Sequence, residues 1–309
     1  MTAVPPPAAS AGLPPAAGPG PTPGPGPADG RLRLPGRLFG GYALDLDGTV
    51  YLGEALLPGA ADTIAAIRAA GSAVVFLTNN PLKPAAAYAA KLTGLGVPAT
   101  EADVVTPLGV LASYLRRRHP GAAVLTVAEP LVDETLAAAG ITVTGDPAAA
   151  GVVAVSFDRT FSYAKLLAAY RAVRLHGAAL VATNPDPYCP TPDGGLPDCA
   201  AMLAAIEACT GARAEAVVGK PSEHMAGELL RRLAAPPGRA AVVGDRLLTD
   251  VRMGQSLGMA GVLVLSGATR PADLAGAEVQ PDYVIDGIGQ LLPAGLAAAP
   301  ASSTHGSTR

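Results

Sequence analysis

Tryptophan is absent from this 309-residue sequence, aromatic residues make up only 4 % of it, and it contains just three cysteines. Cys189, Cys199 and Cys209 lack the close Cys-x-x-Cys spacing that is typical of zinc sites, and their odd number argues against a disulfide framework. On a helix predicted over 198–210, Cys199 and Cys209 would lie about 15 Å apart, which no disulfide spans. Reduced thiols in a cytoplasmic protein are the simplest interpretation.

Basic residues are also few. Lys and Arg together number 22 against 25 Asp and Glu, which gives a formal net charge of −3 and a pI near 5.8. No broad basic face is then available for a phosphate backbone, so we expect no nucleic-acid partner. The one basic cluster, 116–119, is expected to cap the C-terminus of a helix, where cations are favoured.

The beginning of the chain has no long apolar run. It consists mainly of Pro, Ala and Gly, without a basic start, which argues against a signal peptide or a membrane span. Such a segment buries too little surface to offset the entropy lost on ordering. Residues 1–36 are therefore predicted to be disordered, and 294–309 to form a flexible tail.

Hydrophobic residues make up 50 % of the chain, enough for a large core built mainly from Ala, Val and Leu. Short apolar runs alternate with Ala-rich helical runs, which is typical of an α/β protein with a parallel sheet covered on both faces. The strands predicted in this series are 42–46, 73–77, 240–243, 261–265 and an edge strand at 283–285. Its predicted helices are 58–70, 84–95, 108–118, 223–234 and 249–257.

A second α/β series interrupts the first. Its expected elements are strands at 123–127, 152–157 and 179–182 and helices at 131–139, 163–176 and 198–210. We therefore predict a core formed by 37–118 and 215–293, with residues 119–214 inserted as a second domain. An insertion at the loop end of a sheet can act as a lid.

Two carboxylates, Asp45 and Asp47, come at the end of a predicted strand and just before Gly48. They would point the same way if the extended geometry persists. Two like charges held this close are costly unless a cation or a proton is shared between them. The pair is either an acidic strand-to-loop turn or part of a metal-dependent site.

Three further segments place polar residues after strand-like runs: Thr78 to Asn80, Gly219 to Ser222 and Asp245 to Asp250. Taken singly, each could be an ordinary turn, a helix cap or a solvated lysine. Ligands collect at the carboxyl ends of strands in open α/β sheets, so four such segments together predict a site.

The residue types in these segments suit phosphoryl transfer. Asp45, Asp47 and Asp245 supply the hard oxygen ligands that Mg²⁺ prefers. Thr78 and Lys220 supply a neutral donor and a positive charge for an anion beside the metal. A carboxylate nucleophile, a second carboxyl group, a divalent ion and a lysine together indicate an aspartyl-phosphate mechanism.

With these four segments, the chain resembles phosphatases of the haloacid dehalogenase superfamily, in the NagD-type subfamily IIA with a large α/β cap of the C2 type. The resemblance covers about 41–287 and implies a three-layer, Rossmann-like core with a parallel sheet and an inserted cap. It is carried by four motifs in order: Asp45 to Thr49, Thr78 to Asn80, Gly219 to Ser222 and Gly244 to Asp250.

This resemblance implies a role for each matching residue in the first two motifs. Asp45 would be the nucleophile and a magnesium ligand. Asp47 would be the general acid and then the general base, and its backbone carbonyl would bind the metal. Thr78 and Asn79 would bind the transferring phosphoryl group.

The later motifs and the cap complete the implied site. Lys220 would neutralise charge on the nucleophile and the phosphate, Asp245 would bind magnesium, and Asp250 would support the metal shell through water. The loop from Asn184 to Pro190 is similar to that of sugar-phosphate phosphatases found in arabinose operons. Tyr188 and Cys189 would then select the leaving group, unless that loop is only cap structure.

The function that we predict is a Mg²⁺-dependent phosphomonoesterase acting on small phosphorylated metabolites, sugar phosphates first. Phosphoglycolate, glycerol 3-phosphate, pyridoxal phosphate and 4-nitrophenyl phosphate are the alternative substrates. A phosphomutase or a non-catalytic phosphometabolite-binding protein is a further alternative, whereas Asp47 argues against a dehalogenase. The resemblance also suggests a homodimer formed through the caps.

Overall fold

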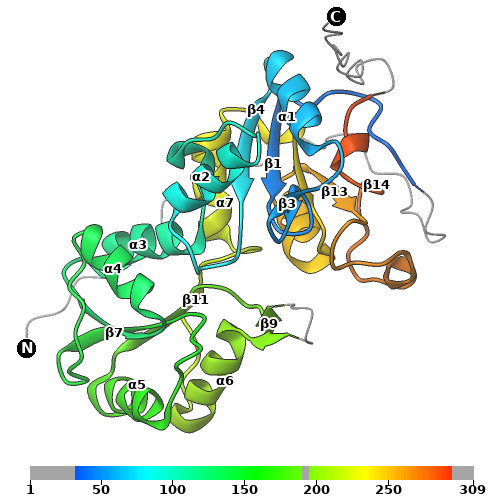
Figure 1. Ribbon diagram of the computed structural model, residues 1–309. Helices are drawn as coiled ribbons and strands as arrows, with labels where there is room; N and C mark the ends of the chain where they lie inside the picture. The colour runs from blue at the N-terminus through cyan, green and yellow to red at the C-terminus, as the bar shows by residue number, and fades with distance from the viewer. Residues whose placement is uncertain (1–31, 190–194, 294–309) are drawn as a thin grey trace, which may run out of the picture.

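A computed structural model describes residues 32–189 and 195–293, and its centre is a six-stranded, entirely parallel sheet (Figure 1). The strand order is β14-β13-β12-β1-β4-β5. The bounds are β1 Gly41–Asp45, β4 Ala73–Leu77, β5 Val104–Val105, β12 Ala240–Gly244, β13 Ala260–Val264 and β14 Tyr283–Ile285. The predicted α/β fold class is confirmed, and β14 lies at an edge as expected.

Helices cover both faces of this sheet because its strands are apolar on both sides. In β1, Tyr42 and Leu44 contribute to one buried cluster and Ala43 to another, as the alternation of side chains along a strand requires. The first cluster is covered by α1 (Ala60–Ala69) and α2 (Ala85–Gly94), and the second by α3 (Pro107–Arg118) and α7 (Glu223–Leu233). This gives three layers of helix, sheet and helix.

A second parallel sheet, of four strands, lies beside the first (Figure 1). Its order is β11-β8-β7-β6, with β6 Ala123–Val127, β7 Ala150–Val155, β8 Ala179–Ala182 and β11 Ala216–Val217. Helices α5 (Tyr163–His176) and α6 (Cys199–Thr210) cover one face, and α4 (Pro130–Ala138) packs on the other. We call this unit the cap. Its α4 face shares one buried cluster with α3 of the first sheet.

The prediction was wrong about the strand that precedes Lys220. The predicted boundary after residue 214 placed Ala216 and Val217 in the core. The structure pairs them with Val181 and Ala182 of β8, so β11 is the edge strand of the cap sheet. A two-residue apolar run carries no information about which sheet it joins, because its partner is set by tertiary packing.

The predicted helix at 249–257 is also divided. A π-helix at Leu247–Val251 precedes a short α8 at Arg252–Ser256. The side chain of Asp250 packs so closely over Gly244 that a Cβ there would lie 2.2 Å from the Asp250 Cγ atom. The wider turn is associated with this buried carboxylate, and π-turns are often found at functional sites.

Short elements were missed by the sequence patterns. Two antiparallel hairpins are formed by β2 (Tyr51–Leu52) with β3 (Ala55–Leu56) and by β9 (Tyr188–Cys189) with β10 (Leu196–Pro197). Four 3₁₀ turns are described at Glu101–Asp103, Pro237–Arg239, Pro271–Leu274 and Ile288–Gln290. Strands of two residues are too short to show an alternating pattern.

The disorder predicted at the two chain ends can be tested only in part, because 1–31 and 294–309 lie outside the described residues. The prediction included residues 32–36, and there it was wrong. Arg33 forms a bridge with Val284, and its backbone N–H donates a 2.7 Å hydrogen bond to the Val284 carbonyl. Pairing with the exposed edge of β14 orders this segment.

Helix boundaries follow local capping chemistry. The Ser162 side chain accepts a hydrogen bond from the Lys165 N–H at the start of α5, and Ser222 does the same for Met225 at the start of α7. Helix α5 ends at Gly177, whose φ of 73° lies in the left-handed region that glycine adopts without strain. In the part of the chain that is described, no helix has both the length and the apolar character required to cross a bilayer.

Candidate active site

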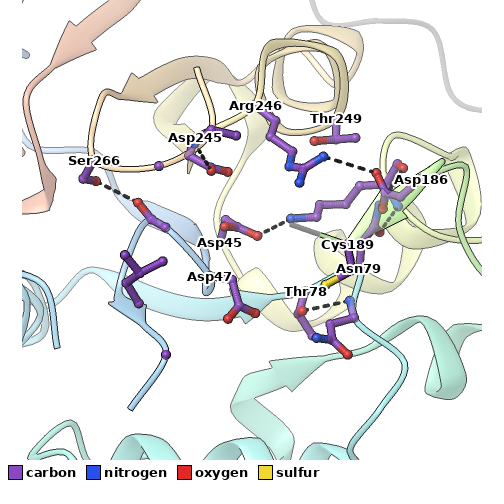
Figure 2. A pocket seen from close by; sticks show the side chains of 17 residues that line it. Asp45, Asp47, Thr78, Asn79, Asp186, Cys189, Asp245, Arg246, Thr249 and Ser266 are labelled. Carbon is purple, nitrogen blue, oxygen red and sulfur yellow. Dashed lines mark hydrogen bonds and ion pairs between the residues drawn. The ribbon is translucent and has the colours of Figure 1, made fainter. Parts of the chain in front are cut away.

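Four segments that are distant in the sequence meet at the carboxyl edge of the six-stranded sheet and line a cavity of about 660 Å³ (Figure 2). Asp45 is the last residue of β1, Thr78 directly follows β4, and Asp245 directly follows β12. Lys220 comes from the loop after β11 and thus enters from the cap. The structure therefore brings together the four segments that the sequence singled out.

Lys220 lies at the centre of this site. Its buried ammonium donates hydrogen bonds to Asp45 Oδ1 and, at 2.7 Å, to Asp250 Oδ1. Burial alone would lower the pKa of Lys220, but the carboxylates of Asp250 and Asp45 raise it above its ordinary value. The lysine therefore stays charged and links two acidic side chains.

Three buried carboxylates lie close together beside Lys220. Asp45, Asp245 and Asp250 each place one oxygen within 4.8 Å of the other two, and their residues are only 7 %, 5 % and 1 % exposed. Burial raises the pKa of Asp45; Lys220 opposes that rise, and the other two carboxylates add to it. Burial and the charge of Asp250 raise the pKa of Asp245 to about 6.

These residues fit a divalent metal ion. The three acidic groups face Lys220 and the partly exposed Arg246, whose charge is shared with Asp186, so negative charge remains in excess and is costly without a further cation. The donors are all carboxylate oxygens, the type that Mg²⁺ and Ca²⁺ prefer. Asp245 accepts a hydrogen bond from the Ala268 N–H at 2.6 Å through Oδ2, which fixes the orientation of its other oxygen.

Both oxygens of the Asp250 side chain accept hydrogen bonds from the protein, which its predicted role did not require. Its Oδ1 accepts from Lys220, and its Oδ2 accepts from the Arg246 N–H and the Thr249 hydroxyl, both at 3.2 Å. Asp250 therefore orients the lysine directly. Its predicted support of a metal through water remains a prediction.

Asp47 lies with Asp45 on the wall of the cavity but at its open mouth, where solvent reaches it. Burial against the cavity wall still raises its pKa, although the surrounding lysines oppose the rise. The next residue, Gly48, has a φ of 87°, and a Cβ there would lie 2.7 Å from Asp245 Oδ2. The Gly48 carbonyl accepts from the Ser266 hydroxyl at 2.7 Å, which anchors this turn.

Thr78 and Asn79, the two residues predicted to bind the phosphoryl group, differ in the hydrogen-bond donors that they can offer to it. The Thr78 side chain is at the cavity, and its oxygen accepts from the Asn80 N–H at 3.0 Å, which leaves its hydroxyl hydrogen as a donor. The Asn79 side chain is instead used within the protein. Its amide nitrogen donates to Asp186 at 2.9 Å and to the Lys220 carbonyl at 3.2 Å, and its oxygen accepts from the Lys220 N–H at 2.7 Å. Only the backbone N–H of Asn79 is then suited to a phosphate.

Tyr188 and Cys189 form the short strand β9 of the cap hairpin. Cys189 lines the cavity, whereas the exposed Tyr188 is not among the residues that line it. Burial raises the pKa of the Cys189 thiol, and nearby carboxylates add to that rise. The structure thus places one of the two predicted selectivity residues in the cavity wall.

Asp186 and Arg246 line the cavity but were not singled out in the sequence (Figure 2). The signals that could have found them are weak. Asp186 lies in the cap loop between two prolines, and Arg246 directly follows Asp245. Gly267 was missed as well, and a Cβ there would lie 2.1 Å from Asp245 Oδ2, so only glycine fits.

Comparison with protein families places both halves of the six-stranded sheet in one superfamily. Residues 42–142 match the model described as haloacid dehalogenase-like hydrolase, and residues 217–291 match a HAD-hydrolase-like model. The two matches contain all four segments that line the cavity.

Curated relatives of similar length include phosphatases. The chain is 35 % identical to the sugar-phosphatase AraL of Bacillus subtilis, over 80 % of this chain and 90 % of that protein. It is also 35 % identical to glycerol-3-phosphate phosphatase of Gallus gallus, over 81 % of this chain and 90 % of the relative.

Solved structures agree with the sequence matches. A 4-nitrophenylphosphatase from Thermotoga maritima superposes with a TM-score of 0.76 at 35 % identity, covering 81 % of this chain and 95 % of that one. NagD from Escherichia coli K-12 gives 0.73 at 28 % identity, with 82 % and 98 % covered. A glycerol phosphate phosphatase from Mycobacterium tuberculosis in complex with calcium gives 0.72 at 33 % identity, with 81 % and 74 % covered.

Proposed function

The chain belongs to the haloacid dehalogenase-like hydrolases, and from this premise we propose that it is a Mg²⁺-dependent phosphomonoesterase acting through an aspartyl-phosphate. The observation that carries the proposal is the position of Asp45. It ends the central strand β1, contacts the charged Lys220, and opens on a cavity. A buried carboxylate with an adjacent cation is suited to attack an anionic phosphate group, because the cation removes the repulsion.

In the first step, an Asp45 oxygen forms a bond to phosphorus while the bond from phosphorus to the leaving-group oxygen breaks. Asp47 donates its proton to that leaving oxygen. Burial raises the pKa of Asp47, which is the direction that a proton donor requires. Thr78 and the Asn79 backbone hold the phosphoryl oxygens, and Lys220 offsets their charge.

In the second step, water attacks phosphorus and the bond to Asp45 breaks. Asp47, now ionised, accepts the proton from that water. Inorganic phosphate leaves, Asp45 is restored, and Asp47 is protonated again for the next cycle.

Mg²⁺ would be held by Asp45, Asp245 and the backbone carbonyl of Asp47, with Asp250 supporting its water shell. When bound, the ion supplies positive charge that stabilises the phosphoryl oxygens and the ionised nucleophile. The excess of buried carboxylates over lysine supports this assignment. The mycobacterial relative is in complex with calcium, which supports a bound divalent ion here.

The size of the cavity between the cap and the core favours a small substrate. The cavity of about 660 Å³ falls in the usual range for small-molecule sites, about 300–1,000 Å³. The relative AraL is named as a sugar phosphatase, which favours a sugar phosphate. Glycerol 3-phosphate and 4-nitrophenyl phosphate follow from the names of other relatives, and phosphoglycolate and pyridoxal phosphate remain alternatives. Cys189, which lines the cavity, and Tyr188, its neighbour in β9, would contact the leaving group.

The proposal also covers the domain boundaries, the oligomeric state and the cellular compartment. Residues 37–118 and 218–293 would form the catalytic core, with residues 119–217, including β11, inserted as the cap. A homodimer through the caps is part of the same proposal. A reducing cytoplasm is consistent with Cys199 and Cys209, neither of which forms a disulfide.

A panel of phosphate esters tests the proposal. Release of inorganic phosphate is measured with Mg²⁺ and with a chelator, for sugar phosphates, glycerol 3-phosphate, phosphoglycolate, pyridoxal phosphate and 4-nitrophenyl phosphate. We expect hydrolysis only with the metal. Isomer formation without phosphate release would indicate a mutase, and no turnover of any ester would contradict the proposal.

A further inference from the structure

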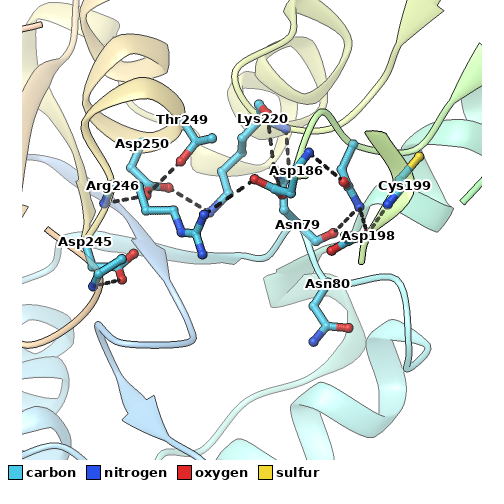
Figure 3. A network of polar contacts seen from close by, with 12 residues as sticks. Asn79, Asn80, Asp186, Asp198, Cys199, Lys220, Asp245, Arg246, Thr249 and Asp250 are labelled. Carbon is cyan, nitrogen blue, oxygen red and sulfur yellow. Dashed lines mark hydrogen bonds and ion pairs between the residues drawn. The ribbon is translucent and has the colours of Figure 1, made fainter. Parts of the chain in front are cut away.

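Asp186 brings a carboxylate from the cap into the catalytic cavity (Figure 3). It lies in the loop between β8 and β9. Its Oδ2 accepts a 2.9 Å hydrogen bond from the Asn79 amide, and its Oδ1 lies 3.7 Å from an Arg246 guanidinium nitrogen. One carboxylate of the cap therefore contacts two segments of the core.

The loop that carries Asp186 is fixed by its own hydrogen bonds. The Asp186 N–H donates to Asn184 Oδ1 at 2.9 Å, and its carbonyl accepts from the Ala200 N–H at 3.1 Å. The Asn184 amide also donates to the Asn79 carbonyl at 3.2 Å. These contacts hold the carboxylate in place before any ligand binds, as a selective site requires.

Arg246 and Asp186 form an ion pair that is too long for a hydrogen bond at 3.7 Å. Burial would lower the pKa of Arg246, but the carboxylates around it, Asp186 first, raise it instead. Both side chains are partly exposed to the cavity. The guanidinium N–H groups and a carboxylate oxygen are thus available to the same ligand.

We propose that Asp186 and Arg246 select the leaving group, favouring a neutral, hydroxylated one and rejecting one that carries a carboxylate. This inference rests on the proposed phosphatase function. A hydroxyl group donates and accepts at once, so it can donate to Asp186 while accepting from Arg246. A carboxylate on the substrate can only accept, so it competes with Asp186 for the arginine and is repelled by it.

Two esters that differ at one position test this selection. Glycerol 3-phosphate carries a CH₂OH group where 3-phosphoglycerate carries a carboxylate. The ratio of kcat/KM for the two is measured, and each ester is also titrated as a competitor of 4-nitrophenyl phosphate hydrolysis. The competition gives a ratio of affinities even where turnover is slow. The wild-type protein is expected to favour glycerol 3-phosphate by at least about tenfold.

Two substitutions should move this ratio in opposite directions. Asp186→Asn keeps an oxygen for the Asn79 amide but removes the charge, so the preference should fall about tenfold. Arg246→Gln leaves the Asp186 charge without its partner, so the preference should increase. The control is Glu129→Gln, which removes a carboxylate from another cap ion pair, with Arg159 at 2.7 Å, away from the cavity. It should leave the ratio unchanged.

The alternative is that Asp186 only positions the core by bonding to Asn79. In that case Asp186→Asn would lower kcat/KM for both esters by the same factor, and the inference would be wrong. A wild-type ratio near one would also overturn it, while phosphate release continued to support the phosphatase. If the wild-type protein hydrolysed neither ester nor 4-nitrophenyl phosphate, the proposed function itself would fail. Thermal unfolding of each variant identifies any that does not fold.

Discussion

The two parallel sheets of this protein differ in how completely the buried carboxylates at their edges are paired. In the cap, Asp158 follows β7 and is buried, and its Oδ1 accepts from the N–H and the hydroxyl of Thr160 at 2.9 and 2.7 Å. Its Oδ2 accepts from Lys165 at 2.6 Å. One carboxylate is thus matched by one ammonium and further donors. At the edge of the first sheet, Lys220 bonds to Asp45 and Asp250, whereas Asp245 accepts from a backbone N–H and shares the nearby Arg246 with Asp186.

The difference distinguishes a structural ion pair from a site. A buried charge that is fully paired and hydrogen-bonded can stabilise a fold without binding anything. Buried like charges without enough partners destabilise the fold, and proteins keep such clusters where a ligand supplies the missing charge. The four predictions below test this comparison, beginning with the largest effect.

Substitution of the proposed nucleophile should give the largest effect. Asp45→Asn should lower kcat at least about a thousandfold, because the amide cannot attack phosphorus. Without metal, the same variant should unfold at an equal or higher temperature, since it removes one of the crowded charges. Phosphate release and thermal unfolding measure the two effects.

Asp158→Asn in the cap is the matched control for that variant. It should keep kcat and lose about 1–3 kcal/mol of stability, because Asp158 is satisfied by its neighbours. Full turnover by Asp45→Asn would rule out the aspartyl-phosphate mechanism. A large loss of stability in Asp45→Asn would contradict the comparison itself.

The two lysines should differ in their contribution to stability. Lys220→Met leaves two buried carboxylates without their cation and should cost about 3–5 kcal/mol. Lys165→Met should cost about 1 kcal/mol, because its side chain is 30 % exposed and Thr160 still holds Asp158. Urea unfolding in the presence of a chelator gives both values. Equal losses would show that the two sites are electrostatically alike.

Metal should stabilise the protein through the first sheet only. At a Mg²⁺ concentration of about 100 times Kd, binding adds about 2.7 kcal/mol, or roughly 5 °C in Tm for a chain of this size. Asp245→Asn should lose most of this shift, whereas Asp158→Asn should keep it. A thermal shift that is the same in all three proteins would place the metal elsewhere.

Asp198 is a buried carboxylate of the cap that, unlike Asp158, has no lysine bonded to it in the described structure. Its substitution should give the smallest of the four effects. It caps α6, and burial raises its pKa from 3.8 to about 6. Between these two pH values the unfolded chain loses the proton while the folded protein keeps it. Ionised Asp198 therefore costs stability above about pH 6 and costs nothing below about pH 4.

Asp198→Asn keeps a side-chain oxygen for the helix cap and should remove that cost. The variant should be more stable than the wild-type protein by about 2 kcal/mol at pH 8 and about equal to it at pH 4. Urea unfolding at several pH values measures the difference. A constant difference at all pH values would contradict the assigned pKa.

Much of the fold could be predicted because its signals are local. Strands β4, β6, β8 and β14 and helix α5 have the predicted bounds, since apolar runs and capping residues act over a few positions. The two-residue β11 was assigned to the wrong sheet because its partner β8 is chosen by tertiary packing. The carboxyl-end segments were found because parallel strands bring their ends to one edge.

The sequence by itself determined the element pattern and the residue types at the strand ends: Asp45, Asp47, Thr78, Lys220 and Asp245. The tertiary structure alone decided which charges meet. Lys220 bonds to Asp45 across 175 positions, and Asn79 bonds to Asp186 across 107. The physical reason is that periodicity and capping are local, whereas the energy of a charge depends on which distant segments exclude water and which partners they bring.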